Sequence, residues 1–130
     1  MENNTENKEV DVRDRLSWIE HKGTRILYVD YSGTSEEEFI QTIEAFENEL
    51  LKQAPGSVVT LTNMADASIT LKVRDRLKEL AERTDKISKG AAAIGVAGFK
   101  KALGALIKRE LYYADSLEEA KDWLAEQAKK

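Results

Sequence analysis

The stretch RILYVDYSGTSEEEFIQTIEAFENEL, residues 25–50, decides the fold. Its first part, from Ile26 to Tyr31, is apolar at nearly every position, which is typical of a strand covered on both faces. Thr34 and Ser35 then precede a run of glutamates in two overlapping capping boxes. Apolar side chains follow at helical spacing, at Phe39, Ile43, Phe46 and Leu50. The stretch therefore predicts a buried strand followed by an amphipathic helix.

The same strand-to-helix step follows in the next segment of the chain. Residues 57–63, SVVTLTN, are rich in β-branched side chains and predict a strand. Asp66 and Ser68 come next as candidate helix caps. The apolar face of the helix comprises Ile69, Val73, Leu77 and Leu80. This unit has the layout of a parallel strand with its crossover helix.

Two further units complete the chain. Residues 90–96, GAAAIGV, predict a strand of small side chains, and a helix is expected at 99–109. The short strand LYYA at 111–114 leads into a last helix, for which Ser116 and Glu119 form a capping box. Each strand after the first pair is therefore followed or preceded by a helix, as in parallel α/β sheets.

The N-terminal side of residues 25–50 indicates a hairpin. LSWIEHK, from Leu16, and RILYVDY are separated by a short turn signal at Lys22, Gly23 and Thr24. The whole order predicts a single-domain α/β fold: a mixed sheet of about five strands, an antiparallel hairpin then parallel βα units, packed with about four helices. We expect this domain over residues 15–130, preceded by a disordered tail at 1–14 that is poor in apolar side chains.

Composition excludes several classes of function. The chain has 130 residues, enough for one domain, and no cysteine, which excludes thiolate chemistry and fits a reducing compartment. Neither a secretory signal nor a membrane span is found, so we expect a cytoplasmic protein. A net charge of -4 and a pI near 5.2 would repel phosphate backbones, so nucleic acid is not an expected partner.

Catalytic groups are sparse. His21 is the only histidine and has no evident Ser or Asp partner nearby in the sequence. The run Glu36, Glu37 and Glu38 is better explained by the dipole of the helix it begins than by metal binding. We therefore expect no metal, no cofactor and no enzymatic activity. Paired carboxylates that meet only in space stay open as an alternative.

Two segments between strands and helices are candidates for binding. GVAGFKK has glycines at Gly95 and Gly98 before Phe99 and Lys100. This pattern is typical either of an anion-binding helix N-terminus or of a tight turn followed by lysines that keep the surface soluble. The helix expected at 99–109 combines an apolar face with basic residues. Packing against the core explains the apolar face, whereas an acidic partner or peripheral contact with a membrane would explain the combination. Ser68 is either a helix cap or a phosphate acceptor.

The segment KGAAAIGVAGFKKALGALIKRELYYADSLEEAKDWL, residues 89–124, resembles the C-terminal half of the STAS/SEC14 (SpoIIAA-like) domain family. The shared pattern is a small-residue strand, a glycine turn, a helix, a short strand and an acidic step into Trp123 and Leu124. The order of elements from Leu16 onward also agrees. The resemblance implies a SpoIIAA/STAS-like fold related to the anti-sigma-factor antagonists.

Those antagonists bind a partner and are switched off by phosphorylation of a serine at a helix start. By position, Ala67 and Ser68 fall near that serine. The antagonists have an Asp-Ser-Ser-Gly type of motif, whereas this chain reads Asp66, Ala67, Ser68, Ile69. The resemblance therefore makes Ser68 a candidate phosphorylation site without matching the motif.

The leading hypothesis is a non-catalytic regulatory or protein-interaction module. Its expected contact surface comprises Asn63, Asp66, Ser68, Gly95, Gly98, Phe99 and Lys100. The alternative is a binder or sensor of a small apolar or anionic ligand, a lipid or a phosphorylated metabolite, in the crevice between the sheet and helix 99–109. A homodimer is compatible with either hypothesis.

Overall fold

The computed structural model describes residues 13–96 and 111–130, which form one five-stranded sheet with the order β1-β2-β3-β4-β5. The strands are β1 (Leu16–His21), β2 (Thr24–Asp30), β3 (Val58–Asn63), β4 (Ser88–Ile94) and β5 (Tyr112–Tyr113). β1 pairs antiparallel with β2, and every other neighbouring pair is parallel. The expected mixed sheet with an N-terminal hairpin is confirmed, and β2 lies inside it.

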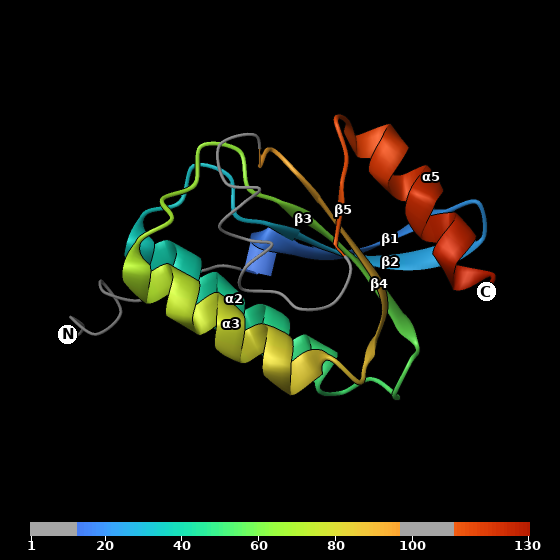
Figure 1. Ribbon diagram of the computed structural model, residues 1–130, viewed down its shortest axis with the longest axis horizontal. Coiled ribbons are helices and arrows are strands. Elements are labelled where there is room, and N and C mark those ends of the chain that lie inside the picture. The colour runs from blue at the N-terminus through green and yellow to red at the C-terminus, as the bar shows by residue number, and fades with distance from the viewer. Residues whose placement is uncertain (1–12, 97–110) are drawn as a thin grey trace.

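Helices cover both faces of the sheet (Figure 1). α2 (Glu36–Leu50) and α3 (Leu71–Thr84) lie side by side on one face, and α5 (Leu117–Ala128) lies on the other. The described residues thus contain three α-helices, fewer than the four expected. The helix expected at 99–109 falls within residues 97–110, outside the described residues. The predicted tail at 1–14 falls almost wholly on residues 1–12, which also lie outside them.

Side chains alternate between the two faces of the sheet. Leu27 and Val29 of β2 pack in the core under α2 and α3, whereas Ile26 packs with Leu61 and Ala92 in a second core under α5. This alternation is the period of two that a strand imposes. It explains why Ile26 to Tyr31 reads as a continuous apolar run, since both faces are covered.

Local capping signals start two of the helices. The Ser35 hydroxyl accepts a hydrogen bond from the Glu38 amide, and Glu38 accepts one from the Ser35 amide, so the predicted capping box at α2 is present. The Thr34 hydroxyl instead donates to a backbone carbonyl at 2.7 Å, so the second overlapping box does not form. At α5 the Ser116 hydroxyl accepts from the Glu119 amide at 3.1 Å.

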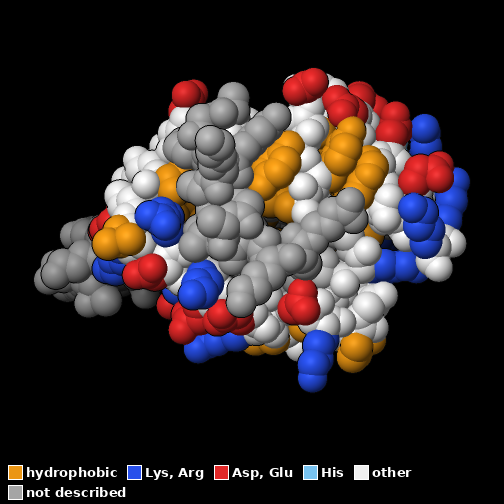
Figure 2. Space-filling model, in the orientation of Figure 1, with side chains coloured by type: hydrophobic (Ala, Val, Ile, Leu, Met, Phe, Trp, Pro, Cys, Tyr) orange, Lys and Arg blue, Asp and Glu red, His pale blue; other side chains and the backbone are white. Residues whose placement is uncertain are grey.

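The molecular surface carries charges of both signs (Figure 2). Acidic side chains gather where α5 begins, as expected for the positive end of a helix dipole. Over the described residues, no helix combines the length and the apolar character that crossing a membrane requires.

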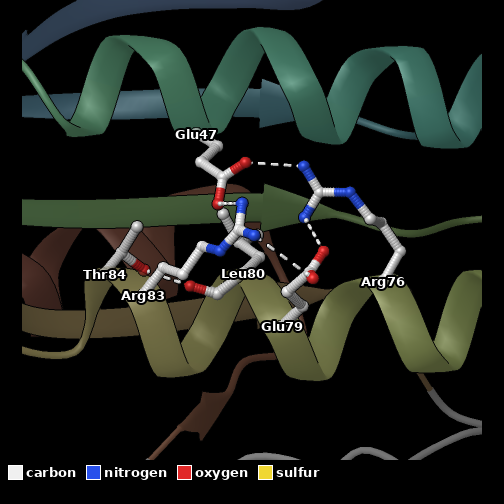
Figure 3. A network of polar contacts seen from close by, with 6 residues as sticks. All are labelled: Glu47, Arg76, Glu79, Leu80, Arg83 and Thr84. Carbon is white, nitrogen blue, oxygen red and sulfur yellow. Dashed lines mark hydrogen bonds and ion pairs between the residues drawn. The ribbon is translucent and has the colours of Figure 1, made fainter.

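An ion-pair network centred on the buried Glu47 joins α2 to α3 (Figure 3). Glu47 is only 5% exposed and accepts hydrogen bonds from Arg76 at 2.6 Å and from Arg83 at 3.3 Å. Glu79 pairs with both arginines, at 3.1 and 3.3 Å. Because a buried carboxylate is stable only when it is paired, these contacts fix the relative position of the two helices.

Replacing Glu47 with Ala should lower the free energy of unfolding by about 1 to 3 kcal/mol, because the largely buried Arg76 then keeps only Glu79 as its ion-pair partner. Glu44→Ala is the matched control, since Glu44 is exposed on the same helix and its loss should change stability by less than about 0.5 kcal/mol. Urea unfolding of both variants measures the difference. Equal stabilities would show that the network does not hold the helices.

Candidate functional site

Three loops meet at the carboxyl ends of the parallel strands. We call residues 31–35, 63–70 and 94–96 the loop platform. The Gly33 amide donates to the Ala65 carbonyl at 2.9 Å, and the Met64 amide donates to the Ile94 carbonyl at 2.9 Å. A third link runs from the Ser68 amide to the Thr34 carbonyl at 3.3 Å. Backbone hydrogen bonds therefore connect all three loops without help from exposed side chains.

Asn63 shapes the platform from within. Its side-chain oxygen accepts a hydrogen bond from the Ala65 amide at 3.1 Å, and its side-chain nitrogen donates to the Tyr28 hydroxyl at 3.3 Å. The side chain is half-buried. Asn63, which the sequence assigned to the contact surface, thus positions the loop that follows β3.

Asp66 and Ser68 form the exposed part of this loop. Asp66 has a φ of 55°, in the left-handed region that Asp and Asn adopt more readily than other non-glycine residues. Ser68 is exposed and comes before the start of α3. Ala67 between them is buried and anchors the loop to the core. The two polar side chains therefore project from a fixed backbone.

The cap of α3 differs from the prediction. Thr70 is the N-cap residue, and its hydroxyl accepts a hydrogen bond from the Val73 amide at 3.2 Å. The same hydroxyl donates to a carboxylate oxygen of Glu36 at 2.6 Å, which joins the starts of α2 and α3. The prediction of Asp66 and Ser68 as caps was wrong. Both residues belong to the loop before α3, where the Ser68 amide donates to the Thr34 carbonyl, and the helix begins only after Thr70.

Gly95 brings the third loop against the second. It has a φ of 74°, and a Cβ atom there would lie 2.5 Å from the Ala65 nitrogen. The close approach therefore requires glycine for both its conformation and its lack of a side chain. Gly98, Phe99 and Lys100, the other residues predicted for this surface, lie outside the described residues.

His21 has a partner that the sequence did not reveal. Its Nε2 atom lies 2.7 Å from Oδ1 of Asp122, and the Lys22 ammonium lies 3.0 Å from the same oxygen. The hydrogen bond from His21, followed by that from Lys22, lowers the pKa of Asp122. The contact joins the β1–β2 hairpin to α5, far from the loop platform. A sequence separation of 101 residues hid it from local pattern analysis.

Glu118 brings a third potential ligand atom near this pair. One ligand atom from each of His21, Glu118 and Asp122 lies within 4.8 Å of the others. The Lys22 ammonium contacts the same Asp122 carboxylate, so a cation bound there would compete with it. We call His21, Lys22 and Asp122, whose contacts connect the hairpin to α5, the clamp.

A small cavity lies between α3 and the sheet. It has a volume of about 50 Å³, and among its lining residues are Tyr31, Thr60, Thr62, Leu77, Leu80 and Ala93. Tyr31 is 1% exposed and stacks on Phe39 with ring centroids 4.1 Å apart. Within the described part of the chain, its hydroxyl has no hydrogen-bond partner. Burial raises the pKa of Tyr31, so the hydroxyl is a neutral donor.

Comparison with models of protein families, with curated proteins and with solved structures found no match to this chain.

The platform predicts unequal effects of alanine at two of its glycines. Gly33 has a φ of 64° and open space around its Cα atom, so Gly33→Ala should cost only the roughly 1 to 2 kcal/mol of left-handed backbone. Gly95→Ala should cost about 2 kcal/mol more, because the new methyl group overlaps the Ala65 backbone. Chemical denaturation of the two variants measures both values. Equal losses would contradict the close packing of the two loops.

Proposed function

We propose that this chain is a cytoplasmic, non-catalytic regulatory or protein-interaction module of the SpoIIAA-like STAS type, which binds a partner protein through the loop platform. The observation that carries the proposal is the set of backbone hydrogen bonds that fixes the three loops to one another. A surface that is already ordered loses little conformational entropy on binding. Asp66 and Ser68 supply exposed polar groups on this surface.

Phosphorylation of Ser68 is the regulatory step that fits this surface. The side chain is exposed, and it is not needed as a helix cap because Thr70 performs that role. A phosphate would add a charge of roughly -2 next to Asp66. It would change the surface that a partner contacts while leaving the fold intact.

If a partner binds at the loop platform, a bulky substitution at Ser68 should prevent binding. Ser68→Arg should reduce recovery of a copurifying partner at least tenfold (about 1.4 kcal/mol), because it introduces a long, charged side chain into the contact surface. Ser17→Arg is the matched control, since Ser17 is exposed on the edge strand β1. Affinity capture from the native cell, followed by mass spectrometry, compares both variants with the wild type.

A protein that is captured equally well by all three forms does not bind at the platform. If no protein is captured reproducibly by the wild type, the interaction hypothesis itself is wrong. Thermal melts of the variants establish that each is folded before capture.

The cavity favours a second candidate function, the binding of a small, mainly apolar molecule. Its walls are mostly aliphatic, and the buried Tyr31 hydroxyl lacks a hydrogen-bond acceptor within the described part of the chain. A bound hydroxyl or carbonyl oxygen would supply that acceptor. The volume of about 50 Å³ suits a short apolar group better than a whole lipid chain.

Tyr31→Phe separates this function from simple packing. Removing a buried hydroxyl that has no partner should raise the free energy of unfolding by about 1 kcal/mol. A small alcohol or ketone should raise the Tm of the wild type but not that of the variant. If Tyr31→Phe is destabilising, the hydroxyl is already satisfied, and the cavity is not a polar-anchored binding site.

A further inference from the structure

A second hollow lies at the opposite end of the sheet, where β2 and β3 begin. Its volume is about 520 Å³, within the roughly 300 to 1000 Å³ typical of small-molecule sites. The β1–β2 hairpin, the loop between α2 and β3 and the end of α5 all contribute to its walls. Residues that define it include Trp18, Lys22, Arg25, Gln53, Ser57 and Lys129. We call it the basic groove.

The charge of the groove differs from that of the chain. The protein has 24 acidic and 20 basic residues, yet three cations, Lys22, Arg25 and Lys129, line the groove. None of the described residues that line it is acidic. Figure 2 shows basic side chains gathered at the end of the molecule that carries the hairpin turn and the C terminus. A concave site lined by one sign of charge concentrates the field of those charges.

Arg25 is held in place before any ligand arrives. Its guanidinium carbon lies 4.2 Å from the centroid of the Trp18 ring. The Trp18 indole is fixed in turn, because its Nε1–H donates to Glu49 at 2.9 Å. This hydrogen bond also lowers the pKa of Glu49, which keeps the anchoring carboxylate charged. A guanidinium held over an aromatic ring by a cation–π contact keeps N–H donors available for an oxyanion.

We propose that the basic groove binds the phosphate group of a small phosphorylated molecule, with Arg25 as the main contact and Lys22 and Lys129 beside it. Lys22 has an exposed ammonium group that also contacts Asp122, so it adjoins both the clamp and the groove. Arginine in a fixed orientation forms paired hydrogen bonds with phosphate oxygens. The polar residues Gln53 and Ser57 also line the groove. The proposal is independent of the loop platform, which lies at the other end of the sheet.

The indole NMR signals of the two tryptophans can show whether a ligand binds in the groove. Trp18 lines the groove, whereas Trp123 stacks on Tyr112 at a ring distance of 4.7 Å and is not part of the groove. In ¹⁵N-resolved NMR spectra of the full chain, inorganic phosphate and glycerol 3-phosphate should shift the Trp18 indole signal and the amides of Gly23 and Ser57 saturably. The Trp123 indole signal should stay in place. Vesicles of phosphatidylcholine with and without phosphatidic acid test whether a lipid headgroup supplies the phosphate.

Arg25→Gln should weaken the affinity at least tenfold, read from the Gly23 and Ser57 amides so that the altered Trp18 contact does not interfere. Lys78→Gln is the charge-matched control, because Lys78 is exposed on α3 and does not line the groove. Binding of either the soluble probes or the phosphatidic acid vesicles, with this dependence on Arg25, supports the proposal. It is overturned if neither the soluble probes nor the phosphatidic acid vesicles bind saturably, or if Arg25→Gln and Lys78→Gln bind equally well.

Discussion

The close approach of the Gly95 and Ala65 backbones, together with the hydrogen bonds beside it, sets the shape of the carboxyl end of the sheet. Parallel strands end at the same edge, so the segments leaving them compete for space there. Two residues allow the close approach: Gly95, which has no Cβ atom, in one loop, and Asp66, which has a left-handed backbone conformation, in another. The exposed polar side chains depend on this backbone frame for their positions.

The two ends of the sheet have different chemical characters. The carboxyl end presents a backbone-braced surface with Asp66 and Ser68, which suits a macromolecular partner. The other end forms a concave, basic groove around a stacked arginine, which suits a small anion. A ligand at the groove and a partner at the platform would contact the same strands from opposite ends.

Local signals in the sequence predicted the elements well because their causes are local. The apolar run from Ile26 to Tyr31 and the capping box at Ser35 reflect the burial and hydrogen bonding of neighbouring residues, and both are confirmed. The α3 cap was misplaced because the link from Ser68 to Thr34 joins segments far apart in the sequence. The His21–Asp122 contact and the basic groove were missed for the same reason. Arg25 and Trp18 are adjacent only through the antiparallel register of the hairpin.

Native-state hydrogen exchange tests the central claim, that the loop platform is rigid, most directly. If the crossing hydrogen bonds brace the loops, the amides of Gly33 and Met64 should exchange as slowly as that of Leu61 within β3, because opening them requires disruption of the sheet. If these amides instead exchange as fast as that of the exposed Gly23 in the hairpin turn, the loops move independently. The platform would then not be a preformed binding surface.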